Sequence, residues 1–286
     1  MIRKRILSTI NTHTLIRDLS RHLLPGIVIL LACASNIHSA AGDPLRYRGG
    51  MRNSPGPHKL NQQQLDAVLK SLRDKTGFRE MSFDGNGFLK LGDPTNYIGG
   101  SEAARSLILL AVGSEKAIDL ESEDRSPAVA FARLSSPVIY QSRATNDKIE
   151  VFPLVIDFTD FPKLRGDKKV LAAFDIGFVI LHELGHAVLS LRDNIDDSEG
   201  PGECEEFVNS IRRELNLPER QNYIARAYKV GLMNSQGQIE RAELFFAHSG
   251  VKPQKYSLSW EAQLVGPIRR GPLPSTKPLS VSVGGQ

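Results

Sequence analysis

Cysteine and long apolar runs are scarce in this chain, and each scarcity excludes a class of protein. Its 286 residues include two cysteines and one tryptophan. We expect the segment that holds Cys33 to be removed, which leaves Cys204 alone and excludes a disulfide framework. The apolar run over residues 23–34 is too short to cross a bilayer comfortably. No internal repeat is visible, which excludes a solenoid.

An excess of positive charge is also missing from the part that we expect to fold. The whole chain carries a net charge of +4. Residues 1–41 account for all of this charge, because Asp18 is the only acidic residue that offsets their basic ones. These basic residues are Arg3, Lys4, Arg5, Arg17 and Arg21. The remainder is formally neutral and lacks the basic patch that nucleic-acid binding requires.

Residues 1–41 have the pattern of a signal peptide. A basic stretch precedes the apolar run, and the small residues Ser39, Ala40 and Ala41 follow it. The alternative is a lipoprotein signal, in which Cys33 follows a lipobox-like Leu-Leu-Ala and carries the lipid. Both alternatives predict a secreted or cell-envelope protein that touches a membrane only through this segment or its lipid.

The rest of the chain is expected to hold one α+β domain. Residues 42–64 are rich in glycine, proline, asparagine and glutamine and predict a flexible linker, and the proline-rich residues 266–286 predict a disordered tail. The domain then covers residues 65–265. Within it we expect helices over 65–75, 101–113, 220–232 and 239–247, a hairpin about residues 84–87, a strand over 116–121, and two strands within 138–158 joined at Asn146-Asp147.

The stretch that carries chemistry runs from Phe174 to Asp193, FDIGFVILHELGHAVLSLRD, and predicts a buried helix. Residues four apart lie on one helix face, so His182 and His186 can bind the same metal ion. Glu183 lies beside them, where a carboxylate can take a proton from a water molecule and pass it to a leaving amine. Two imidazoles and a carboxylate favour Zn²⁺. The pattern is the H-E-x-x-H of zincins, and Gly185 within it allows another segment to approach closely.

A third protein ligand is expected, and several acidic residues compete for the position. Leu189 and Arg192 replace the glycine and histidine of the metzincin extension, which excludes that class. The next helix, ECEEFVNSIRRELNLP, has an apolar stripe through Cys204, Val208, Ile211 and Leu215 that Glu205 borders. Glu205 is the predicted ligand, with Asn209 supporting a ligand from one turn further on and the two arginines on the solvated face. The alternatives are Glu203, Glu206, Asp193, Asp196 and Asp197.

Two further features of a peptidase site have candidates. Tyr223, Tyr228 and His248 are candidate donors to the oxyanion of a tetrahedral intermediate. Residues 151–158 are a candidate edge strand that holds an extended substrate by strand addition.

Three stretches together resemble the bacterial effector-protein zinc metallopeptidases. They are SEAARSLILLAVGSEKAIDLES, the HELGHA helix and the helix end IRRELNLPER, and the resemblance covers roughly residues 75–230. It implies a gluzincin in which His182 and His186 bind zinc and Glu183 is the catalytic base. It also implies type III effectors or toxin-associated proteases that cleave host signalling proteins, delivered into a host cell. The shorter acidic loop of this chain leaves the family's third ligand unplaced, and a signal peptide departs from type III delivery.

We therefore expect a zincin-like single domain that hydrolyses peptide bonds in a protein or peptide substrate. Its fold would combine the metal helix, a second ligand-bearing helix and a small, mainly antiparallel sheet. The alternatives are a zincin-fold binding module without turnover and a lipid-anchored envelope protease.

Overall fold

The computed structural model describes residues 48–141, 147–194, 200–234, 237–248 and 254–266. The chain divides into two units, residues 1–35 and 36–286, and every described residue belongs to the second. The predicted signal peptide and most of the predicted tail therefore lie outside the described residues. No helix in the described ranges is both long and apolar enough to cross a membrane.

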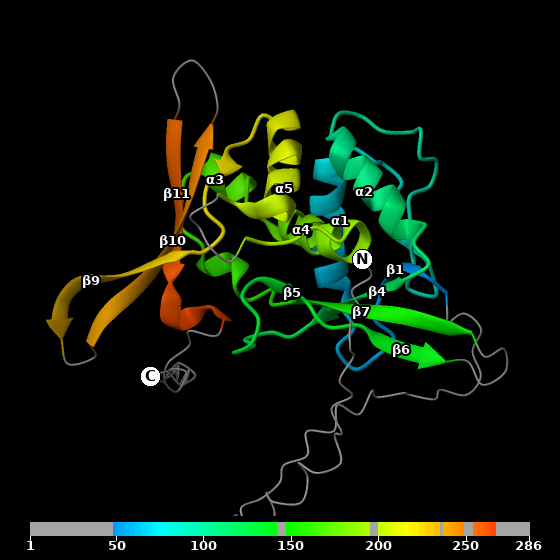
Figure 1. The fold of residues 1–286 in the computed structure, drawn as a ribbon, viewed down its shortest axis with the longest axis horizontal. Helices are drawn as coiled ribbons and strands as arrows, with labels where there is room; N and C mark the ends of the chain where they lie inside the picture. The colour runs from blue at the N-terminus through cyan, green and yellow to red at the C-terminus, as the bar shows by residue number, and fades with distance from the viewer. Residues whose placement is uncertain (1–47, 142–146, 195–199, 235–236, 249–253, 267–286) are drawn as a thin grey trace, which may run out of the picture. The chain divides into compact units, whose positions relative to one another are not determined.

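The described part is α+β, as the sequence predicts (Figure 1). Its larger sheet has the order β1-β4-β7-β5, and β6 also pairs with β7. The pairs β1–β4 and β4–β7 are parallel, whereas β5 and β6 run antiparallel to β7. This sheet is therefore mixed, and not mainly antiparallel as predicted. The strands are β1 (Gly50–Asn53), β4 (Ala117–Ser122), β5 (Ala132–Leu134), β6 (Val138–Gln141) and β7 (Lys148–Ile156).

Helices predicted from their caps and periodicity are present. Asn61 forms a capping box at the start of α1, and Ser101 and Gly113 flank α2 as expected. The hairpin about residues 84–87 joins β2 to β3, and Asp84 accepts backbone hydrogen bonds within that turn. These elements are α1 (Gln62–Thr76), β2 (Ser82–Phe83), β3 (Leu89–Lys90), α2 (Glu102–Val112), α3 (Lys168–Ala172), α4 (Ile176–Leu189) and α5 (Gly202–Glu214).

The predicted flexible linker is wrong from residue 50 onward. Residues 42–47 lie outside the described residues, but Gly50–Asn53 form strand β1, which pairs in parallel with β4. Met51 is buried in the main core, and Arg52 forms a buried ion pair with Asp119 at 2.6 Å. Glycine and proline in this stretch therefore mark turns around a strand, which composition alone does not reveal.

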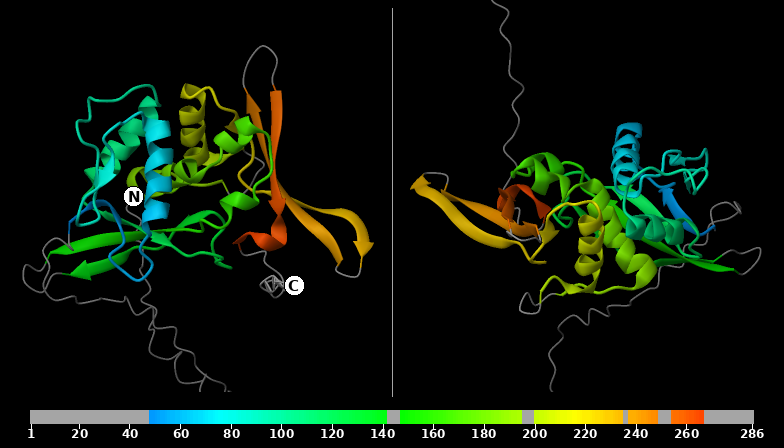
Figure 2. Two further views of the ribbon diagram at one scale, coloured as in Figure 1. Left: turned by 180° about the vertical axis from the view of Figure 1, so that it is seen from behind. Right: turned by 90° about the horizontal axis from the view of Figure 1, so that it is seen from above.

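The two helices predicted after residue 219 are also wrong, because these segments form a second sheet. Strand β9 pairs antiparallel with β10, which pairs antiparallel with β11 and β8. In β10 the buried residues Ala242, Leu244 and Phe246 alternate, which is the period of a strand. Figures 1 and 2 show the β9–β10 hairpin projecting from the rest of this sheet. The strands are β8 (Glu219–Arg220), β9 (Arg226–Asn234), β10 (Gly237–His248) and β11 (Gln254–Glu261).

Helix α4 lies between two hydrophobic cores, which explains why it is apolar on nearly every side. Ile180, Leu181 and Leu184 belong to the core formed with α1, α2, α5 and the larger sheet. Val179 packs instead against the core of the second sheet, which contains Trp260. In Figure 1 α4 accordingly occupies the centre of the described structure, between α1 and α5.

The N-terminus of α4 is fixed to α1 by polar contacts. Asp175 caps α4 by accepting from the Phe178 backbone N–H at 3.2 Å, and it forms an ion pair with the buried Lys75. The Ser71 hydroxyl donates to Asp175 at 2.9 Å and accepts from the Gly177 N–H at 2.9 Å. A side chain at Gly177 would collide with Ser71, so the helix start is held closely and its first turn cannot shift.

Candidate metal centre and adjoining pocket

His182, Glu183 and His186 all lie on α4, and the two imidazoles converge as their spacing predicts. Nε2 of His182 lies 3.2 Å from Nε2 of His186. Nδ1 of His186 lies 2.7 Å from the carbonyl oxygen of Leu191. Because a carbonyl oxygen can only accept, Nδ1 carries the proton of the neutral ring, and Nε2 presents a lone pair.

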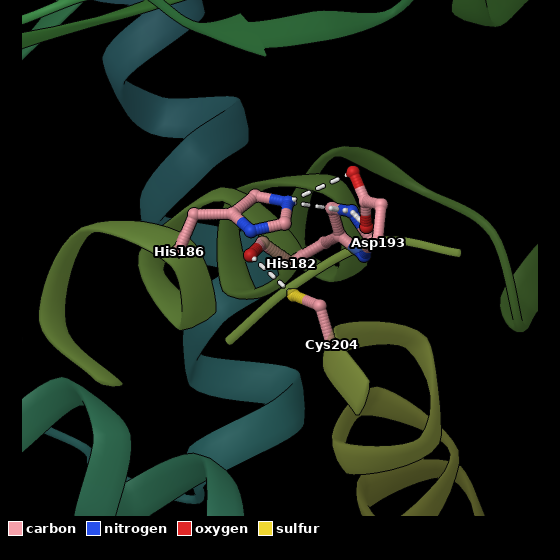
Figure 3. A group of neighbouring side chains, drawn as sticks. All are labelled: His182, His186, Asp193 and Cys204. Atoms are coloured by element: carbon pink, nitrogen blue, oxygen red, sulfur yellow. Dashed lines mark hydrogen bonds and ion pairs between the residues drawn. The ribbon is translucent and has the colours of Figure 1, made fainter. Parts of the chain in front are cut away.

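The third member of this group is Asp193. Its Oδ1 lies 3.1 Å from Nε2 of His182, and its Oδ2 lies 3.1 Å from Nε2 of His186. Figure 3 shows this carboxylate beside both rings, with the nearest nitrogen of His186 pointing toward it. Asp193 is one of the alternatives to the predicted ligand Glu205, and its carboxylate contacts both imidazoles.

Asp193 reaches the histidines because α4 ends earlier than predicted. The helix stops at Leu189, and Ser190 takes a left-handed conformation with φ of 57°. The chain then reverses along the helix, and Leu191 donates its N–H to the Gly185 carbonyl at 3.2 Å. Directly before Asp193, the Arg192 carbonyl accepts from the Cys204 N–H at 3.1 Å. These two bonds fix the backbone that carries Asp193.

Glu205 lies on the far side of the His182 ring from Asp193, at Nδ1 instead of Nε2. Its Oε2 lies 3.3 Å from Nδ1 of His182, an ion-pair distance without the alignment of a hydrogen bond. Its Oε1 pairs with Arg212, and Oε2 also accepts from Arg220 at 2.9 Å. The carboxylate of Glu205, a residue that is 1% exposed, thus forms ion pairs with two guanidinium groups. Glu205 therefore supports the orientation of His182 from its outer nitrogen.

The remaining predicted residues fall into place around this pair. Asn209 accepts from Arg212 and from the Arg220 N–H, each at 2.8 Å, so it supports the two arginines that bind Glu205. The prediction of a solvated face is wrong for Arg212, which is buried because it spans from Glu205 to the Ala173 carbonyl. Glu203 and Glu206 are exposed, and Glu206 pairs with Arg213 at 2.9 Å. Asp196 and Asp197 lie outside the described residues.

The group fits a metal ion on several observations. Oδ1 of Asp193 is buried and receives no well-aligned hydrogen bond from the described residues. Nε2 of His182 lies 3.1 Å from that oxygen and Nε2 of His186 lies 3.1 Å from the other carboxylate oxygen, distances that ligands of a shared cation would have. The sulfur of Cys204 completes a set of four possible ligand atoms that all lie within 4.8 Å of one another. However, this thiol donates to the His182 backbone carbonyl at 3.1 Å, as Figure 3 also shows.

The electrostatics of the group favour positive charge at its centre. The hydrogen bond with Asp193 raises the pKa of His186 to about 10. Burial opposes ionisation of Asp193, but its bonds to both histidines and to Tyr223 hold its pKa below the usual range. Without a metal ion this arrangement retains protons, and a divalent cation would have to displace them to bind.

Glu183 points to the edge strand of the larger sheet. Its Oε2 accepts a hydrogen bond from the Leu134 backbone N–H at 2.9 Å. Burial raises the pKa of Glu183, as is common for a general base, and the neighbouring histidines oppose that shift. The edge strand beside α4 is therefore β5, and the predicted residues 151–158 fall largely in β7, which is enclosed between β4 and β5.

Tyr223 is the predicted oxyanion donor that lies at the site. Its ring stacks on His182 with centroids 5.9 Å apart, and its hydroxyl donates to Oδ2 of Asp193 at 2.5 Å. That proton is already used, so Tyr223 orients Asp193 in this structure. Tyr228 is exposed on β9 and His248 ends β10, and neither lies among the residues that line the adjoining pocket.

A pocket of about 250 Å³ opens beside His182 and Glu183. One part of its wall is aromatic. The aromatic residues lie before α4, within it and after it in the sequence, so their proximity cannot be read from the sequence: Phe131, Phe174, Phe178 and Trp260. Leu244 and Ala225 add aliphatic surface, and Arg212 and Arg220 lie at the polar end with Glu205. The pocket thus combines apolar walls with a polar end beside Glu183.

Comparison with known proteins adds no name to this site. No protein-family model, no curated protein and no solved structure matches the chain.

Proposed function

We propose that this chain is a zincin-like, zinc-dependent endopeptidase. One arrangement carries the proposal: Glu183 interacts electrostatically with the converging His182, His186 and Asp193, and it also lines a pocket. A structural metal site has no use for a positioned base. A hydrolase needs one within reach of the metal and of the substrate.

The roles of the residues follow from their contacts. His182, His186 and Asp193 hold the metal, and Glu205 fixes the ring of His182 from behind. Zn²⁺, when bound, supplies a Lewis acid that polarises the scissile carbonyl and acidifies the attacking water. Glu183 accepts the proton of that water and passes it to the amine that leaves. An extended peptide lies along β5 and directs one side chain into the pocket.

The biological setting is a proposal from the sequence. The resemblance to effector-protein metallopeptidases supports a secreted bacterial effector or toxin-like protease with a protein substrate, such as a host protein. The signal-like residues 1–41 support secretion, or attachment to the cell envelope if Cys33 carries a lipid. Mass spectrometry of the mature N-terminus distinguishes these destinations, because lipidation at Cys33 and cleavage after Ala41 give different masses.

A second candidate function is a binding module built on a closed metal site. It is favoured by Cys204, whose sulfur lies within 4.8 Å of the other ligand atoms. Four protein ligands complete a tetrahedral structural zinc site and leave no position for water. Against it, the thiol already donates to the His182 carbonyl.

The test of the proposed function combines metal content with cleavage. The full chain and Glu183→Gln are loaded with zinc and incubated with an unfolded protein library, and new termini are identified by mass spectrometry. A positioned base contributes about 10²–10⁴-fold, so we expect the variant to lose at least that much activity while it binds zinc normally. Equal cleavage by the two proteins, or no cleavage by the native chain, would contradict the proposal.

A further inference from the structure

The edge strand β5 differs from an ordinary edge strand in the backbone groups that it leaves available to a partner. Strand β5 ends the larger sheet, and Ser135 N–H donates to Pro153 while the Phe131 carbonyl accepts from Asp157. Backbone hydrogen-bonding groups alternate in direction along a strand. The N–H and carbonyl of Arg133 therefore also point toward β7, whereas those of Ala132 and Leu134 point away from it. An ordinary edge strand would offer N–H and carbonyl groups alternately to a partner.

Both outward N–H groups of β5 are already engaged within the protein. Ala132 donates to the Ala130 carbonyl at 2.8 Å, which closes a γ-turn around Phe131. Phe131 has φ of 65°, a strained conformation for a residue with a side chain. Leu134 donates to Oε2 of Glu183 at 2.9 Å. The free edge therefore meets a ligand with its carbonyl oxygens.

Several contacts hold the strained turn, so its geometry is fixed before any substrate binds. The Phe131 N–H donates to Asp160 at 3.2 Å, and its ring makes edge contacts with Phe161, Phe174 and Trp260. Strain that is maintained by so many contacts is typical of functional sites. It sets the position of β5 relative to α4, and hence of Leu134 relative to Glu183.

We propose that Leu134 is a positioning residue whose backbone N–H holds the Glu183 carboxylate for proton transfer, and that the β5 edge binds substrate through its carbonyl oxygens alone. This inference rests on the proposed function. An unfixed glutamate has several rotamers, only some of which reach the attacking water. The donor to Glu183 belongs to β5, the strand along which the peptide is proposed to lie. The position of the base is therefore coupled to the position of the peptide.

Proline at position 134 tests the role of this N–H directly. Leu134→Pro removes the donor to Glu183 but no hydrogen bond of the sheet, and proline is tolerated at edge positions that face outward. Leu134→Ala is the matched control, because it removes more of the side chain and keeps the N–H. We expect Leu134→Pro to lower kcat by roughly 10–100-fold with KM nearly unchanged, and Leu134→Ala to behave as the native chain.

Other kinetic results would overturn the inference while leaving the proposed function intact. If the N–H pairs with substrate, Leu134→Pro raises KM and leaves kcat unchanged. If it has no role, the proline and alanine variants give equal rates. Zinc content and the thermal unfolding midpoint of each variant are measured alongside, and a loss of kcat that follows loss of folding or zinc in both variants also contradicts positioning.

Amide hydrogen exchange on the full chain tests the inference without activity. In Glu183→Ala the Leu134 amide should exchange roughly tenfold faster than in the native chain, as expected when one hydrogen bond is lost. The amide of Ser135, which donates to Pro153, should be unchanged and serves as the internal control. An unchanged exchange rate of the Leu134 amide would overturn this inference, whether or not the native chain cleaves a substrate. Absence of cleavage with a faster-exchanging amide would overturn only the proposed function.

Discussion

Asp193 and Glu205 are two carboxylates on opposite sides of one imidazole, and their surroundings give them different tasks. Asp193 faces Nε2 of His182 from a short loop and keeps a buried oxygen without a well-aligned donor. Glu205 faces Nδ1 from within a helix, and Arg212 and Arg220 occupy its oxygens. The partners of a carboxylate, more than its proximity to a histidine, therefore decide whether it is free to bind a metal.

The largest effect that this comparison predicts is on metal binding after loss of Asp193. Asp193→Ala removes one of the three ligands that we propose, so we expect zinc affinity to fall by more than the roughly 100-fold that loss of a supporting residue can cause. Titration with a competing zinc chelator measures the change. Glu206→Ala, which removes an exposed carboxylate on α5 that pairs with Arg213, is the control and should bind zinc as the native chain does. Equal affinities in these two variants would remove Asp193 from the site.

Loss of Glu205 should have a smaller effect on metal and a distinct one on stability. Glu205→Gln should weaken zinc binding by about 10–100-fold, because His182 loses the group that orients it. It also leaves two arginines without their carboxylate, and breaking a buried ion pair costs about 3–5 kcal/mol. Chemical denaturation of the metal-free variant measures this cost. Stability within 1 kcal/mol of the native value would contradict the Arg212–Glu205–Arg220 arrangement, by comparison with the ~3–5 kcal/mol expected.

The pocket predicts an intermediate effect on substrate choice. Ala225→Phe should fill the space beside Trp260, so that peptides with a bulky side chain next to the cleaved bond lose about tenfold in kcat/KM, near the 1–3 kcal/mol that a pocket contact contributes. Peptides with alanine there should be unaffected. Ala227→Phe, on the exposed face of β9, is the control. Because Trp260 is the single tryptophan, its fluorescence also reports directly on occupation of the pocket.

The smallest effect is expected at Glu206, the neighbour of Glu205 in the sequence. Its ion pair with Arg213 is exposed on both sides. Glu206→Gln should change stability by less than about 0.5 kcal/mol and leave zinc affinity unchanged. A large loss of stability or of zinc affinity in this variant would contradict the different roles that we assign to the buried Glu205 and the exposed Glu206.

What could be predicted from sequence was whatever depends on short spacing. His182 and His186 converge because four residues make one helical turn, and the burial of Glu205 next to the exposed Glu206 follows from the apolar stripe of α5. Asp193 could not be placed in advance, since it reaches the site only through the left-handed Ser190 and the reversal that follows.

Tertiary pairing explains the other failures. The segments of β9 and β10 contain good helix formers, but their pairing with each other and with β11 overrides that preference. Arg212 seemed to belong to a solvated face, and only the fold brings Glu205 and the Ala173 carbonyl to it. The engagement of Leu134 with Glu183 likewise joins residues from two elements that no local pattern connects.

The most direct test of the central claim is X-ray absorption at the zinc edge of the zinc-loaded full chain. We predict a first shell of nitrogen and oxygen only, from His182, His186, Asp193 and a water molecule, at about 2.0–2.2 Å. That shell describes an open site in which Glu183 can act. A zinc–sulfur distance near 2.3 Å would instead place Cys204 on the metal and close the site, and a chain that retains no zinc would contradict the metal centre itself.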